Sequence, residues 1–215
     1  MRVTLAFVLV AGAVTAAVVG GGVLARGGGS GGEAPSAQKP SSSTTPLADY
    51  DTTTARVARA PFCDAIDDRQ VDAVLGEVPD ALEWRNGDEI DLSGGGSDVV
   101  HEFGCRYAVQ DVGTAQAWVF APPVDASRAA RLVKSAEKAA GCQVGSGPAF
   151  GSPTLALTCT TRDGTTRASY RGLFGDAWLV CEVELPTGSA DSAGSTDIAD
   201  VAGRWCVGVL EAASA

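Results

Sequence analysis

The stretch TLALTCTTRDGTTRASYRGLFGDAWLVCEVEL, residues 154–185, decides the fold. Apolar residues occupy every second position over residues 154–160 and again over 179–185, which is the period of half-buried strands. Between these runs, the Asp-Gly dipeptide at 163–164 favours a hairpin turn into a third strand over residues 165–171. Strands joined by hairpins are antiparallel, so the stretch predicts an antiparallel sheet.

Further strands are expected earlier in the chain. Residues 103–109 alternate in the same way, and residues 114–121 form a strand that is apolar on both faces at its end. Residues 81–85 are interpreted as one more strand, and the glycine-rich residues 86–98 as a mobile loop. The predicted strands therefore lie both before and after the predicted helix that begins at Asp125.

Three helices are expected around these strands, each with apolar residues at helical spacing. The capping residues are aspartates and the stop signals are glycines: Asp67 or Asp68 with Gly76, Asp125 with Gly141, and Asp197 for the last helix. The pattern therefore predicts an α+β fold, in which an antiparallel sheet of about five to six strands carries three helices on one face.

The N-terminus carries an uncharged apolar run from Val3 to Leu24, which is long enough to cross a bilayer as a helix. Residues 1–25 are interpreted as a transmembrane anchor, with a cleaved signal peptide as the alternative. In both cases the rest of the chain is exported. Residues 26–59 are rich in Gly, Ser, Thr and Pro and predict a disordered stalk, followed by a single domain over 60–215. The expected location is the cell membrane, with the domain outside the cytoplasm, or secretion if the signal is cleaved.

Export places the six cysteines in an oxidising compartment, where an even number predicts disulfides rather than a metal site. Three of them lie on predicted strands with their apolar neighbours pointing the same way, and three lie in or beside predicted helices. If each bridge joins a helix to a strand, six pairings remain, one of which joins neighbours along the chain. The cysteines are Cys63, Cys142 and Cys206 near helices, and Cys105, Cys159 and Cys181 on strands.

Residues 60–215 contain 11 Lys plus Arg and 23 Asp plus Glu, a net charge of −12. An acidic surface repels phosphate backbones, so nucleic-acid binding is excluded. The acidic run over residues 77–98 lacks the spacing of a calcium loop, and Glu182 and Glu184 on one strand face are interpreted as solvated acids. No cofactor or metal is expected.

Several local motifs resemble a known group of proteins. Cys63 leads into a short helix that ends in Leu75-Gly76, a strand contains Gly104-Cys105-Arg106-Tyr107, and Trp205-Cys206 lies in the last helix. Together with the membrane segment and stalk, they resemble actinobacterial cell-envelope, lipoprotein-like extracellular domains of unknown function. They are also similar to the extracellular sensor domain of mycobacterial serine/threonine kinases. The resemblance implies a disulfide-bonded α+β ectodomain without established catalytic residues. One departure is that Arg26 follows the small-residue site, so lipid attachment is excluded there.

These observations favour a membrane-tethered binding or interaction module of the cell envelope that is not an enzyme, with an envelope ligand or protein as partner. The alternatives are a secreted hydrolase that uses His101, the only histidine, and a purely structural spacer. Large aromatic residues on the second face of the sheet are the candidate binding surface, unless loops 86–98 or 186–196 cover them as a minor core. They are Trp118, Phe120 and Trp178.

Overall fold

The computed structural model describes residues 45–91, 97–161, 164–188 and 197–214. The stretch that decides the fold forms three consecutive antiparallel strands, as predicted: β7 (Thr154–Thr160), β8 (Thr165–Phe174) and β9 (Ala177–Pro186). β4 (Glu102–Val109) and β5 (Gly113–Phe120) form a second hairpin, and β5 joins it to β9. Two long hairpins therefore meet in the middle of one sheet.

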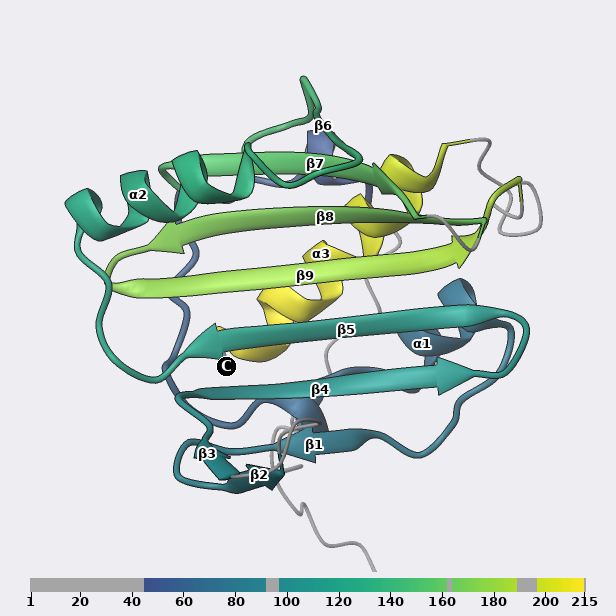
Figure 1. Cartoon of the computed structure of the whole chain (residues 1–215), viewed down its shortest axis with the longest axis horizontal. Coiled ribbons are helices and arrows are strands. Elements are labelled where there is room, and N and C mark those ends of the chain that lie inside the picture. The colour runs from purple at the N-terminus through teal and green to yellow at the C-terminus, as the bar shows by residue number, and fades with distance from the viewer. Residues whose placement is uncertain (1–44, 92–96, 162–163, 189–196, 215) are drawn as a thin grey trace, which may run out of the picture. The chain divides into compact units, whose positions relative to one another are not determined.

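Short strands complete the sheet at both edges. β1 (Leu82–Trp84) pairs with β4, and β6 (Cys142–Val144) pairs with β7, giving the order β1-β4-β5-β9-β8-β7-β6 (Figure 1). The sheet has seven strands, more than the predicted five to six, because β6 was not foreseen. A separate two-stranded pair, β2 (Glu89–Asp91) and β3 (Ser97–Val99), lies in the region predicted as a loop.

The three predicted helices are present and begin where their aspartates indicate. α1 (Asp68–Leu75) is capped by Asp67 and ends at Gly76, whose φ of 72° suits a residue without a side chain. α2 (Ala126–Ala136) is capped by Asp125 and ends before the predicted Gly141. α3 (Ile198–Ala213) is capped by Asp197. Two short 3₁₀ turns, η1 (Leu47–Asp49) and η2 (Cys63–Ala65), precede α1.

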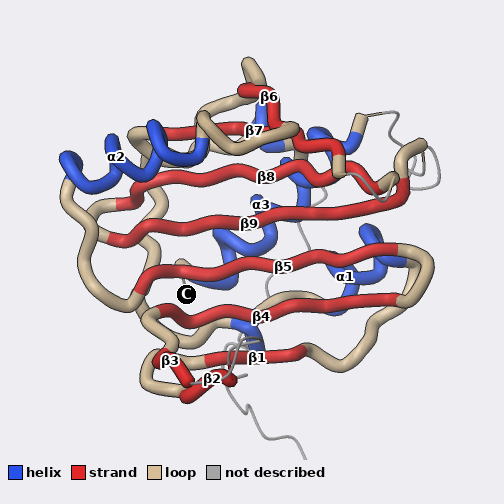
Figure 2. Tube along the Cα trace, viewed as in Figure 1, coloured by secondary structure: helices blue, strands red, loops and turns tan. Residues whose placement is uncertain are grey.

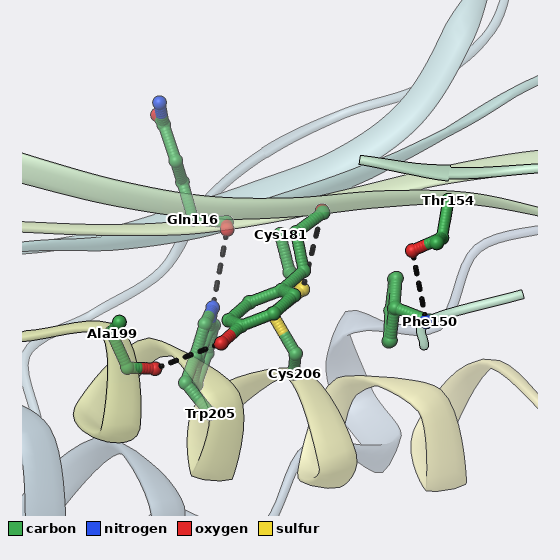
Figure 3. Close-up of a disulfide and its surroundings, with 8 residues drawn as sticks. Gln116, Phe150, Thr154, Cys181, Ala199, Trp205 and Cys206 are labelled. Atoms are coloured by element: carbon green, nitrogen blue, oxygen red, sulfur yellow. Dashed lines mark hydrogen bonds between the residues drawn. A yellow bond between two sulfur atoms is a disulfide. The ribbon is translucent and has the colours of Figure 1, made fainter. Parts of the chain in front are cut away.

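The main core lies between the sheet and α3. α3 is buried along most of its length, and its Trp205 side chain is 0% exposed. The Trp205 indole stacks edge-on against Tyr107 at 6.0 Å, and its Nε1 donates a hydrogen bond to the Gln116 backbone oxygen at 3.2 Å (Figure 3). Burial raises the pKa of Tyr107 to about 12, with smaller contributions from nearby acids such as Glu83. α1 packs on this same side of the sheet.

The prediction that all three helices share one face is wrong, because α2 lies on the opposite face (Figure 1). Val124, just before α2, and Ala129, in its first turn, pack against Trp178 and Val180 of β9. The reason lies in β9, which is apolar on both faces: Leu179 faces α3 while Trp178 and Val180 face α2. Period-two alternation therefore could not assign one buried face to this strand.

All six cysteines are paired, in the arrangement that joins neighbours along the chain. Two bridges join a helical turn to a strand, and their Cα atoms are 5.9 and 5.6 Å apart. The third joins strands β6 and β7 instead of a helix and a strand, because Cys142 enters β6 directly opposite Cys159. Cys159 accordingly faces α2 rather than the main core. The pairs are Cys63–Cys105, Cys142–Cys159 and Cys181–Cys206.

The folded domain begins earlier than the predicted boundary at residue 60. Leu47 is 3% exposed and packs in the main core. The Ala58 backbone N–H donates to the Ala213 oxygen at 2.8 Å, and Arg59 lies 3.1 Å from Asp176 and donates to the Ala121 oxygen at 2.6 Å. Residues 45–59 are therefore part of the domain rather than of a disordered stalk.

The predicted anchor at 3–24 and the first part of the predicted stalk lie outside the described residues. Within the described residues, no helix has the length and apolar character required to cross a bilayer.

Candidate functional site

α2 covers only part of its side of the sheet. It lies over the β7, β8 and β9 side, and no helix of the described chain lies in front of β4 and β5 (Figure 2). We term this uncovered region, on the α2 side of β1, β4, β5 and the adjoining part of β9, the open face. Its floor consists of side chains from four strands: Trp84, Arg106, Gln116, Trp118 and Glu182.

One end of the open face is aromatic. The Trp84 indole lies on the backbone of Gly104, where any added Cβ would collide with the ring, so the close approach requires glycine. The Trp84 Nε1 donates to the Glu102 Oε1 at 3.0 Å. Burial raises the pKa of Glu102, and this hydrogen bond partly opposes the shift. Trp118 lies directly opposite Gly104 in the register, so both half-buried indoles lie at this end.

The centre of the open face holds a buried carboxylate. Glu182 lies on the central strand β9 and is only 4% exposed. Its Oε1 accepts a hydrogen bond from Gln116 Nε2, across the strand pair, and lies 3.8 Å from an Arg167 guanidinium nitrogen. Figure 3 shows the Gln116 side chain leaving the sheet on the side opposite Trp205 and the Cys181–Cys206 bridge. A buried carboxylate needs such partners, because its desolvation is otherwise unfavourable.

Arg171 is the second arginine beside Glu182. Its side chain is partly buried, and its Nε is fully buried without a hydrogen-bond partner among the described residues. Burial lowers the pKa of Arg171, and the negative charge of Glu182 acts in the opposite direction. Unsatisfied buried donors are uncommon in folded proteins, which marks this guanidinium as a feature that packing alone does not explain.

A pocket of about 470 Å³ lies beside the open face, next to the β4–β5 turn. Its lining includes Arg106 and Thr114 from the hairpin, and Thr165 and Glu184 from the adjoining strands. The Thr165 hydroxyl donates to the Glu184 Oε1 at 3.0 Å. The pocket is therefore continuous with the polar part of the open face through Arg106.

The predicted binding residues do not all reach the surface. Trp178 is 2% exposed under α2, so its assignment to a binding surface is wrong. The cover comes from α2 and the segment before it. Phe120 and Trp118 are half-buried against the same cluster, and the Arg128 guanidinium lies 5.9 Å from the Phe120 ring centre. Of the three predicted aromatics, Trp118 is the one that borders the ionic centre, which is the cluster of Glu182, Arg167 and Arg171. It does so because it lies next to Gln116 on that face of β5.

Sequence reasoning missed the ionic centre, and interpreted Glu182 as a solvated acid. A signal was present: Arg167 and Arg171 share one face of β8 with Ser169 between them, while Glu182 interrupts an apolar strand. Charged residues at inward positions of central strands indicate a buried polar cluster.

The residues weighed for catalysis or metal binding are His101 and the acidic residues. The His101 side chain is exposed, and its backbone oxygen accepts a hydrogen bond from the Ala121 N–H at 3.0 Å. Across the described segments, no group of three or more His, Cys, Asp or Glu side chains is placed to hold a metal ion.

Fold and site together define a disulfide-bonded α+β domain with one half-covered sheet face. No family model, curated protein or solved structure matches the chain.

Proposed function

We propose that this protein is a membrane-tethered, extracytoplasmic binding module of the cell envelope, sensor-like and non-catalytic, whose ligand or protein partner binds on the open face. The tether is the apolar run at 3–24, and the stalk is what precedes residue 45. The three disulfides of the domain suit the oxidising compartment outside the cytoplasm.

The observation that carries the proposal is the composition of the open face. A sheet face that meets only water is normally polar, with short side chains. Here two half-buried indoles, Trp84 and Trp118, share the open face with the buried Glu182 carboxylate, and two arginines of the next strand, β8, lie beside this carboxylate at the border of the face. Aromatic and arginine side chains are enriched at binding surfaces because they combine apolar area with directed hydrogen bonds.

The chain offers an internally controlled test, because it has four tryptophans. Trp84 and Trp118 lie on the open face, whereas Trp178 and Trp205 are 2% and 0% exposed. The full-length protein in a mild detergent is titrated with an aqueous extract of the source organism's cell envelope, and the four indole N–H signals are followed by NMR. Single Trp→Phe variants assign the signals.

We expect the Trp84 and Trp118 signals to shift together, while those of Trp178 and Trp205 stay in place. An extract that moves none of the four signals contradicts the proposal and favours the structural spacer. A shift confined to Trp178 or Trp205 would place binding elsewhere.

A further inference from the structure

We propose that Arg167 and Arg171 form a binding site for an anionic group, a carboxylate or a phosphate, with Glu182 as the positioning residue between them. The inference rests on the proposed function, because it names the ligand chemistry at the β8 border of the open face.

The strand geometry sets the two arginines on either side of one acid. Arg167, Ser169 and Arg171 occupy alternate positions of β8 and therefore share one face. The register places Ser169 opposite Glu182, so each arginine is a diagonal neighbour of the carboxylate. Diagonal neighbours lie about 7–8 Å apart at the backbone, within reach of long side chains.

The acids near the two arginines leave guanidinium hydrogen-bond donors unused. Glu182 is one carboxylate between two guanidinium groups, and its distance of 3.8 Å from Arg167 is longer than a hydrogen bond. Glu184 lies directly opposite Arg167 in the register but accepts its hydrogen bond from Thr165. The two glutamates balance the charge of the two arginines, while donors remain available for a further acceptor.

Packing does not account for Arg171. Its register neighbours are Leu155 on β7 and Val180 on β9, which are 4% and 1% exposed. An apolar residue would suit this position, yet the chain places a guanidinium there with its Nε buried and unsatisfied. The side chain as a whole is only partly buried, so an anion would bind at its terminal guanidinium nitrogens rather than at the buried Nε, since planar guanidinium groups bind carboxylate and phosphate oxygens in pairs.

The surroundings indicate what the anionic group is attached to. Trp118 pairs with Val180 across β5 and β9, and Val180 pairs with Arg171 across β9 and β8. The Trp118 indole therefore lies two strands away from Arg171. A ligand whose anionic group contacts the arginines would extend an apolar or planar part over Trp118.

The test uses the full-length protein in a mild detergent, with sodium phosphate and sodium acetate as probes. Sodium chloride at equal ionic strength is the reference. The Nε–Hε signals of Arg167 and Arg171 are followed by NMR. We expect both signals to shift and saturate with at least one probe, and the probe that saturates at the lower concentration identifies phosphate or carboxylate as the preferred group. The proposal is overturned if the two signals shift no more with phosphate or acetate than with chloride at the same ionic strength.

Variants separate binding from folding. Arg171→Gln is expected to weaken probe binding about tenfold or more, because one charge-assisted contact is lost. Arg131→Gln removes the same charge from the exposed side of α2, where Arg131 bonds to Ser127, and is expected to leave binding unchanged. Equal weakening by both variants would overturn the proposal, since it would show a general charge effect.

Arg171→Leu provides a second readout. If Arg171 is kept for binding, Leu at this position between apolar neighbours abolishes probe binding and leaves the Tm equal or higher. A lower Tm with unchanged probe binding would show that Arg171 is a structural residue, and the proposal fails.

If the arginine signals do not respond to either probe while the Trp84 and Trp118 signals respond to the envelope extract, the proposed function stands without the anion site. The reverse result sinks the proposed function and keeps the anion site.

Discussion

Replacing Trp178 with Ala tests whether α2 covers the second face of the sheet. Trp178 is 2% exposed and packs among Val124, Ala129, Leu173 and Val180. Truncating a fully buried Trp lowers the free energy of unfolding by about 3–5 kcal/mol, because apolar burial is lost and a cavity remains. For a domain of this size each kcal/mol lowers the Tm by about 2–4 °C, so we expect a fall of roughly 6–20 °C.

Circular dichroism melting and urea unfolding of the full-length protein measure this loss. Trp118→Ala is the matched control, since the same side chain is removed from a half-buried position on the neighbouring strand. Its loss should be smaller, in proportion to the area withdrawn from water. Trypsin should also cleave faster at the exposed Lys134 of the Trp178→Ala variant, because α2 loses its main contact. A Tm that falls by less than about 3 °C would refute the position of α2.

Three further predictions concern the bridges and the pH dependence of stability. Peptide mapping without reduction should find only Cys63–Cys105, Cys142–Cys159 and Cys181–Cys206, and any other pair contradicts the fold. Replacing both Cys181 and Cys206 with Ala opens a loop of 25 residues and should lower the free energy of unfolding by about 3–4 kcal/mol in urea titrations. Burial raises the pKa of Glu102, so the folded state holds this proton to higher pH than the unfolded state does. Stability from this group is present below the ordinary pKa and is lost as pH rises through the raised one. Glu102→Gln keeps an acceptor for Trp84, so urea unfolding should find it more stable than wild type at pH 7 and about equal near pH 4. An unchanged pH slope would show that Glu102 is not desolvated.

The elements that could be predicted are those set by local chemistry. Asp67, Asp125 and Asp197 each accept a hydrogen bond from a backbone N–H of the helix they precede, so the three helix starts were readable from single residues. The long strands were readable from alternation, and the Asp-Gly turn marked the β7–β8 connection. The pairing of cysteines that are neighbours along the chain was one of the six that the sequence left open, and the folded structure has that pairing.

What could not be predicted depends on contacts distant in sequence. Leu47 is a lone apolar residue in a polar stretch, and its burial follows from its fit beside Gly203 of α3. From its neighbours in the sequence, Glu182 is predicted to be a surface acid. It is buried because β5 and β8 pair with β9 on both sides. The face that α2 covers depends on which of the two apolar faces of β9 it packs against. Because residues of β9 are apolar on both faces, the alternation along the strand does not distinguish between them.

The open face follows from the size of α2 relative to the sheet. A helix is about 10 Å across and neighbouring strands are about 4.8 Å apart, so a single helix covers about two to three strands. α2 has 11 residues and is the sole helix of the described chain on its side of a seven-stranded sheet, so no helix among the described residues covers a strip over β1, β4 and β5. Such a strip is most soluble with polar side chains, yet this one holds Trp84 and Trp118, and two arginines of β8 lie across β9 from it. The ligand that we propose for this region, with an anionic group and an apolar part, would account for that composition.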